Sequence, residues 1–131
     1  MEMNHPFYWF ECNGRSDETA QFYGKVFGWE VKTEEIDPEM GAFPLFSMPG
    51  AESPFAHFFN MNGQEGMENV PPHWALYVGV PNVDEAVANV EAAGGKLLMP
   101  AMDLPVGRMA MVADPDGATF WVYTPPAAPA E

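Results

Sequence analysis

The side chains best suited to chemistry are few and widely spaced. His57 and His73 carry imidazoles, which bind divalent metals or transfer protons near neutral pH. A metal site needs three or four converging ligands, so these two histidines are candidate members of a site rather than a complete one. Cys12 is the single cysteine, and no neighbouring base is identifiable that would activate it as a nucleophile. The sequence therefore assigns no catalytic residue.

Arg108 is one of only five basic residues in the chain. It follows Gly107 at the start of a predicted strand, where its guanidinium could bind a ligand carboxylate through two hydrogen bonds. The alternative is an ion pair with one of the 19 acidic residues, which is the commoner role of a surface arginine. Both alternatives stay open at this point.

A second set of candidates is mainly aromatic or contains thioether groups, and it is suited to binding a small apolar or aromatic molecule. Core packing explains many such side chains unless several of them border an open space. The predicted ligand pocket consists of Tyr8, Phe10, His57, Tyr77, Arg108, Met109, Met111 and Trp121.

Strand alternation makes a prediction about the first apolar run. If Tyr8 and Phe10 face the pocket, Glu11 lies on the opposite face and meets solvent or a helix. Cys12 then shares the face of Tyr8, where a free cysteine is expected to act as a small buried hydrophobic residue.

The elements that must position these residues follow a doubled plan. When the second half of the chain is laid over the first at one constant offset, Asp17-Glu18 falls on Asp84-Glu85 and Gly28 falls on Gly95. Each half is therefore predicted to be one copy of the same unit. The order within each copy is strand, helix and three strands.

Helix ends and strand runs give the predicted boundaries. Ser16 and Asn82 are the expected N-caps of the two helices, and Gly28 is the expected C-terminal residue of the first. Pro44 is expected to place its strand at a sheet edge or in a bulge. The predicted strands are Phe7 to Cys12, Glu30 to Ile36, Ala42 to Met48, Phe55 to Met61, Trp74 to Val80, Lys96 to Met102, Arg108 to Ala113 and Ala118 to Thr124.

Length and charge limit the classes of function. The 131 residues suit one domain, and 19 acidic against 5 basic residues give a formal charge of −14, which disfavours nucleic acid as a partner. No run approaches the ~18 apolar residues of a membrane span, and the N-terminus does not read as a signal peptide. We expect a cytoplasmic protein that binds neither nucleic acid nor membranes.

Three segments together resemble a known family. FYGKVFGW, YVGVPNVDEAVANVEAAGGK and GRMAMVADPDGATFWVY are similar in order and spacing to the vicinal oxygen chelate superfamily, which includes glyoxalases, bleomycin-resistance proteins and extradiol dioxygenases. The resemblance implies an α+β fold of two βαβββ modules whose curved mixed sheets surround a cleft, in a homodimer. The implied organisation is a single glyoxalase-like domain, 1–131, with modules at 7–62 and 73–124, a connector at 63–72 and a flexible tail at 125–131.

The resemblance also implies where metal ligands would lie in metal-dependent relatives. Three of the four places fall on Tyr8, Ala75 and Trp121, and the fourth lies in 54–59, where His57 is the one strong metal-binding side chain. Phenol, methyl and indole groups are not usual ligands for zinc, nickel or iron. We expect an aromatic pocket that binds a small molecule without the usual metal. The alternative is a divalent-metal-dependent lyase, isomerase or dioxygenase that uses His57 and His73.

Overall fold

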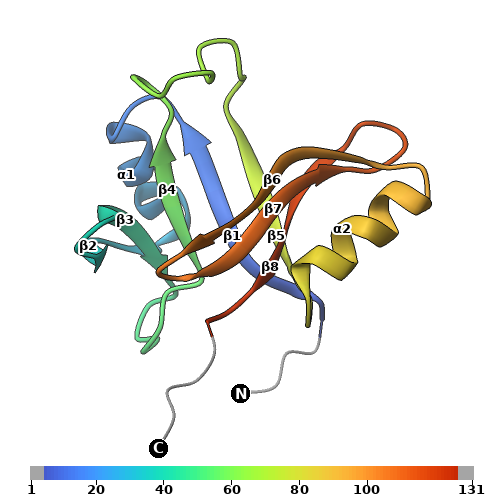
Figure 1. The fold of residues 1–131 in the computed structure, drawn as a ribbon. Helices are drawn as coiled ribbons and strands as arrows, with labels where there is room; N and C mark the ends of the chain where they lie inside the picture. The colour runs from blue at the N-terminus through green and yellow to red at the C-terminus, as the bar shows by residue number, and fades with distance from the viewer. Residues whose placement is uncertain (1–4, 127–131) are drawn as a thin grey trace, which may run out of the picture. The chain divides into compact units, whose positions relative to one another are not determined.

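The computed structural model describes residues 5–126, and it confirms the α+β class and the βαβββ order in both halves (Figure 1). All eight predicted strands are present, each to within two residues at either end. The predicted tail lies, from residue 127 onward, outside the described residues. None of the helices in 5–126 is long and apolar enough to cross a membrane.

The chain divides into two compact units. The N-terminal unit is Trp9–Ala75, and the C-terminal unit combines the residues up to Tyr8 with those from Leu76 onward. The division falls inside the strands β1 (Phe7–Gly14) and β5 (His73–Gly79).

The N-terminal unit contains the helix α1 (Glu18–Phe27) and the strands β2 (Glu30–Asp37), β3 (Gly41–Ser47) and β4 (Ala56–Asn60). The strand order is β2-β3-β4-β1. Strands β1 and β4 are parallel, with Glu11 opposite His57, whereas β3 is antiparallel to both of its neighbours. This register places side chains of β1 and β4 next to one another on the same face of the sheet.

The C-terminal unit repeats this plan with the helix α2 (Val83–Ala92) and the strands β6 (Lys96–Leu104), β7 (Gly107–Ala113) and β8 (Thr119–Thr124). The strand order is β5-β8-β7-β6, with β5 and β8 parallel and the other pairs antiparallel. The register sets Trp121 between Tyr77 of β5 and Met111 of β7.

Local chemistry explains most of the helix ends. The Asn82 side-chain oxygen accepts a hydrogen bond from the Glu85 amide at 2.9 Å, which confirms Asn82 as the N-cap of α2. The N-cap of α1 is Asp17 rather than Ser16, so this prediction was wrong by one residue. The Ser16 hydroxyl still accepts from the Glu18 amide at 3.2 Å, because the turn keeps it near the first free N–H groups. Gly28 ends α1 with φ of 75°, as predicted.

Pro44 lies in a strand with neighbours on both sides, so the prediction of an edge strand was wrong. It is opposite Thr33 of β2, but the pairing of β3 with β4 includes only Leu45 and Phe46. Pro44 thus lies where β3 is not paired with β4, so its lack of an N–H group removes no hydrogen bond between these two strands.

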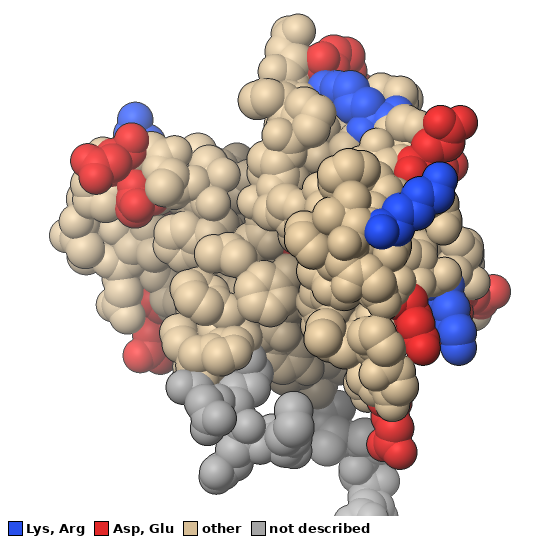
Figure 2. All heavy atoms as spheres, turned by 180° about the vertical axis from the view of Figure 1, so that it is seen from behind, with Lys and Arg blue, Asp and Glu red and all other residues tan. Residues whose placement is uncertain are grey.

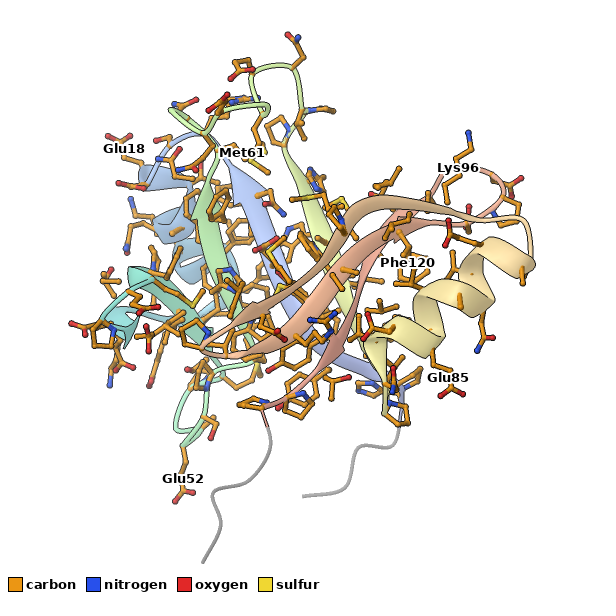
Figure 3. All side chains as sticks on the ribbon, viewed as in Figure 1. Glu18, Glu52, Met61, Glu85, Lys96 and Phe120 are labelled. Atoms are coloured by element: carbon orange, nitrogen blue, oxygen red, sulfur yellow. The ribbon has the colours of Figure 1, made fainter. Side chains whose placement is uncertain are left out.

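Each unit packs its helix against one face of its own strands. In the N-terminal unit this core contains Cys12, Ala20, Phe46, Ala56 and Phe58, with Phe10 and Tyr23 packed against it. In the C-terminal unit it contains Val83, Ala110, Val112 and Val122, and Phe120, labelled in Figure 3, packs against it. The opposite face of each sheet is therefore not covered by the helix of its own unit.

The turn before β8 is held by the backbone and side chain of Asp114. The Gly117 amide bonds the Asp114 carbonyl at 2.9 Å, and the Asp114 carboxylate accepts from the amides of Asp116 and Ala118 at 2.9 and 3.0 Å. This rigid turn sets where β8 starts and hence which face Trp121 occupies.

Candidate functional site

The C-terminal unit presents an aromatic face on the side of β7 and β8 away from α2. Ala110, Val112 and Val122 pack on the α2 side, so alternation sends their strand neighbours to the other side. The residues of this aromatic face are Tyr8, Tyr77, Met109, Met111, Trp121 and Tyr123. Four of the predicted pocket residues that lie on β5, β7 and β8 thus come together: Tyr77, Met109, Met111 and Trp121.

The rings of the aromatic face contact one another in a defined geometry. Tyr77 and Trp121 are stacked with centroids 5.6 Å apart and planes 7° apart. Tyr123 meets the edge of Tyr77 at 6.2 Å and contacts Tyr8 at 4.9 Å. Such offset and edge contacts hold rings firmly, so the face is a rigid surface rather than a set of mobile side chains.

Tyr123 is fixed by its hydroxyl as well as by its ring. The hydroxyl donates a hydrogen bond to the Val106 carbonyl. Burial, together with the neighbouring Tyr8 phenol, raises the pKa of Tyr123 to about 12. The phenol therefore stays protonated and continues to donate at neutral pH.

Trp121 carries the one unsatisfied polar atom of this face. Its indole Nε1 is buried, and no residue in 5–126 accepts its hydrogen bond. A buried donor without an acceptor costs about 1 to 3 kcal/mol, and buried indole N–H groups usually have a partner. The donor is therefore unsatisfied within 5–126, in a face where Tyr77, Met109 and Tyr123 are themselves buried.

The N-terminal unit contains a polar cluster on its face away from α1, formed by Trp9, Glu11, Asn13 and His57. His57 Nε2 lies 2.9 Å from Glu11 Oε2, and Asn13 Nδ2 donates to Glu11 Oε1 at 3.0 Å. Trp9 Nε1 donates to His57 Nδ1 at 2.7 Å. The cluster is well shielded, because Glu11 and Asn13 are both buried.

The indole of Trp9 determines which ring nitrogen of His57 carries the proton. An indole N–H can only donate, so His57 Nδ1 must accept and the ring proton must reside on Nε2. Nε2–H then donates to the Glu11 carboxylate. His57 is therefore neutral in this arrangement, and its two ring nitrogens both have partners.

The placement of Glu11 corrects the prediction that it meets solvent or a helix. Phe10 and Cys12 pack against α1, so it is Glu11 that lies on the face away from the helix. The alternate side chains of β1 were assigned to the wrong faces of the sheet. Aromatic residues occur at both sets of alternate positions, so the sequence shows no clear amphipathic pattern. Phe10, proposed for the ligand pocket, accordingly belongs to the core under α1.

Cys12 is buried beneath α1, where its thiol contacts the Tyr23 hydroxyl at 3.8 Å. Burial raises the pKa of Cys12, and the nearby charge of Glu11 raises it further, although the Tyr23 contact opposes the shift. The thiol is thus held in its unreactive protonated form.

Arg108 is engaged in ion pairs on the α2 side. It binds Asp84 through NH2 at 2.9 Å and Nε at 3.3 Å, and it binds Asp103 through NH1 at 3.0 Å. These carboxylates raise its pKa further above the ordinary range. Arg108 borders a separate pocket of about 320 Å³, whose lining includes Asp84, Asp103 and Thr124 as well as Val83 and Leu104. It is therefore not part of the aromatic face.

The donors present do not fit a divalent metal. His57 is tied to Trp9 and Glu11, and the exposed His73 has its Nδ1 2.8 Å from the Pro71 carbonyl. Within 5–126, no three His, Cys, Asp or Glu side chains are grouped so that they could hold a metal ion. Zinc sites in proteins use three or four side-chain ligands.

Two features of these sites could not be taken from residue types alone. The pairing of Glu11 with His57 depends on the β1–β4 register, and that of Trp9 with His57 depends on strand parity. These pairings could have been predicted if Glu11 and His57 had been assigned to the same face of two adjacent parallel strands.

The paired βαβββ modules and the turn at Asp114 define the class of protein. The chain belongs to the glyoxalase/bleomycin resistance protein/dioxygenase superfamily, whose family model matches residues 12–122.

Two curated relatives show what similar sequences are called. The chain is 36% identical over 129 residues to an anthracycline biosynthesis protein, DnrV, of Streptomyces peucetius, covering 88% of this chain and 45% of that protein. It is 32% identical over 111 residues to a putative glyoxylase, CFP32, of Mycobacterium bovis, covering 82% of this chain and 41% of that one. The chain thus spans less than half the length of these relatives.

Solved structures share the fold at low sequence identity. Methylmalonyl-CoA epimerase from Mycobacterium tuberculosis has a TM-score of 0.61 at 16% identity, with 97% of this chain and 94% of that chain covered. The Mn(II)-bound glyoxalase from Novosphingobium aromaticivorans has a TM-score of 0.59 at 20% identity, with coverage of 91% and 38%. At these identities the likeness concerns the fold alone.

Proposed function

We propose that this chain binds a small, flat, aromatic molecule on the aromatic face and that Trp121 Nε1 donates a hydrogen bond to it. The observation that carries the proposal is the buried indole N–H without an acceptor in the described chain. A carbonyl or ether oxygen on the bound molecule would satisfy this donor. The partly exposed Trp121 and the exposed Tyr8 would supply the apolar contact, with the buried Tyr77 ring stacked against Trp121.

The names of the relatives support this choice of ligand. Two relatives that are 36% identical to the chain are called anthracycline biosynthesis proteins. Anthracyclines contain fused aromatic rings that bear oxygen atoms, which match a flat aromatic surface with one free donor. We take this as support for the class of ligand and not for a particular compound.

We propose further that binding does not use the metal known from relatives. The places at which the family resemblance implies ligands include Tyr8, Ala75 and Trp121, and none has a usual metal-binding side chain. The remaining candidate, His57, has both ring nitrogens engaged. The bound molecule would therefore be held by ring contacts and hydrogen bonds.

The test is a titration with 2-(hydroxymethyl)anthraquinone, a neutral fused-ring probe with carbonyl acceptors, followed by calorimetry. Trp121→Phe keeps a ring on the face but removes the N–H, so affinity should fall roughly 3- to 10-fold, as expected for one lost hydrogen bond. Trp74→Phe is the matched control, because Trp74 Nε1 already donates to the Tyr23 hydroxyl at 3.1 Å. Equal affinity of the Trp121 variant and the wild type would refute the proposal.

The second candidate is a metal-dependent lyase, isomerase or dioxygenase, in which a metal would have to replace the 2.9 Å contact between Glu11 and His57. The distinguishing measurement is the metal content of untagged protein after exposure to zinc, nickel, iron and manganese. About one retained equivalent per chain, lost in His57→Phe, would favour this enzyme over the metal-free binding protein.

A further inference from the structure

We infer that a group of methionines in the C-terminal unit forms a binding site for a soft monovalent metal ion, Cu(I). The group, called the methionine block below, consists of Met99 and Met102 of β6 and Met109 and Met111 of β7. The inference goes beyond the proposed function and does not depend on it, because it rests on the β6–β7 pairing and on thioether chemistry.

The register of β6 and β7 places the methionine block on one face of the sheet. Met99 is directly opposite Met111, and Met102 is directly opposite Met109. Directly opposite residues of an antiparallel pair point to the same face. Met109 and Met111 lie on the aromatic face, so Met99 and Met102 lie there as well, and the block consists of two neighbouring cross-strand pairs.

Two irregularities in β6 bring its methionines to this face. The register shifts between Leu97 and Met99 and again between Met99 and Met102. Leu97 is opposite Val112, which packs on the α2 side, so strict alternation would place Met99 on that side too. The first shift turns Met99 to the aromatic face, and the second does the same for Met102. Bulges of this kind are over-represented beside active sites, where they re-aim a side chain.

The spacing of the two pairs allows their sulfur atoms to converge on one ion. The Cβ atoms of directly opposite residues lie about 4.5 to 5.5 Å apart, and alternate residues of one strand lie about 7 Å apart. Each sulfur is two bonds beyond Cβ on an unbranched side chain with three rotatable bonds. Three sulfurs can therefore approach a common point between the strands through side-chain rotation alone.

The methionine block is buried at one end and open at the other. Met109 is 6% exposed, Met102 and Met111 are half-buried, and Met99 is 38% exposed. An ion can therefore enter past Met99 and lose most of its contact with water nearer Met109. Trp121 is directly opposite Met111, so an indole ring, whose π-face attracts cations, adjoins the block.

The thioether groups determine the class of metal. Soft sulfur ligands select Cu(I), whereas carboxylate, carbonyl and water ligands suit Mg²⁺, Ca²⁺ and Mn²⁺. A thioether has no proton to lose, so it binds a metal without the deprotonation that Cys and His ligands require. The site is also independent of the His, Cys, Asp and Glu side chains, which form no group of three for a metal within 5–126.

The charge of the chain favours the binding of a cation. The formal charge is −14, and Figure 2 shows Asp and Glu side chains at several separate places on the face that it draws. Such an excess of acids raises the local concentration of cations. Lys96 shares the face of the methionine block, because it is opposite Ala113, but it is exposed and Figure 3 shows its side chain extending away from the ribbon.

The test follows the methionine methyl groups of the wild-type protein by carbon–proton NMR during titration with Ag(I), an air-stable substitute for Cu(I). Methyl signals are assigned by their loss in single Met→Leu variants. The signals of the methionine block should shift and saturate together. Met48 is the matched control, because it is 55% exposed and lies in the N-terminal unit, and its signal should stay in place. Block signals that do not move in excess Ag(I), or move no further than that of Met48, would overturn the inference.

Leucine variants separate metal binding from packing. Leucine has nearly the volume of methionine but no sulfur, so the double variant Met99→Leu/Met111→Leu should fold and should bind Ag(I) roughly tenfold more weakly, as read from the Met102 and Met109 signals. Met48→Leu should bind as the wild type does. Met99→Leu alone, at an exposed position, provides the same test if the double variant does not fold. Affinity equal to that of the wild type would overturn the inference and leave the four methionines as packing groups.

Discussion

Replacement of His57 by Phe tests whether the polar cluster of the N-terminal unit is held as the geometry indicates. Phe keeps an aromatic ring in contact with Phe43, whose ring lies 5.5 Å away, but it removes both nitrogens. The substitution leaves Glu11 Oε2 without its 2.9 Å donor and leaves the Trp9 indole N–H without its 2.7 Å acceptor.

The expected loss in the free energy of unfolding follows from these two hydrogen bonds. A hydrogen bond to a charged group contributes about 1.5 to 3 kcal/mol and a neutral one about 0.5 to 1.5 kcal/mol. His57→Phe should therefore lower the free energy of unfolding by roughly 2 to 4 kcal/mol. This is a large share of the ~5 to 15 kcal/mol of a typical domain.

The assay is equilibrium unfolding in urea, monitored by circular dichroism. His73→Phe is the matched control, because His73 is exposed and its ring has one described contact, with the Pro71 carbonyl. Its effect should stay within about 0.5 kcal/mol of the wild type. A His57 variant as stable as the His73 variant would refute the reasoning about the cluster.

Four further outcomes are expected. Because the pKa of Tyr123 is raised to about 12, the folded state keeps a proton that the unfolded chain loses near pH 10; stability should fall as the pH rises from 10 to 12, and Tyr123→Phe should flatten this fall in urea titrations at each pH. Cys12, buried and with a raised pKa, should react with a thiol reagent such as DTNB far more slowly in buffer than in denaturant, and rapid labelling of folded protein would contradict its placement. Asn82→Ala should cost about 1 kcal/mol through loss of the α2 cap, more than Ser16→Ala, as measured by urea unfolding. Light scattering should give twice the mass of one chain, as expected for a homodimer, whereas a monomer at all concentrations would refute that expectation.

The fold could be predicted from the sequence because its signals are local and repeated. The caps, the Asp114 turn and the alternation in β7 each specify an element within a few residues. The constant offset between the halves then implies that the same supersecondary unit occurs twice.

The site could be predicted only in part. Tyr77, Met109, Met111 and Trp121 come together because each lies on a strand with clear parity. Glu11 and Phe10 were placed on the wrong faces because apolar residues occupy both parities of β1, and only packing against α1 decides between them. The role of Arg108 depended on two carboxylates at a distance in sequence, which spacing alone does not identify.

The most direct test of the central claim is the nitrogen–proton spectrum of the four tryptophan indoles, recorded during titration with the neutral anthraquinone probe. Trp121→Phe assigns the Trp121 indole signal by its loss. Binding through Trp121 Nε1 should shift this signal strongly downfield, because a donor without an acceptor gains one, and should leave the Trp9 signal in place. Saturation of the protein with probe while the Trp121 signal stays unchanged would contradict the account.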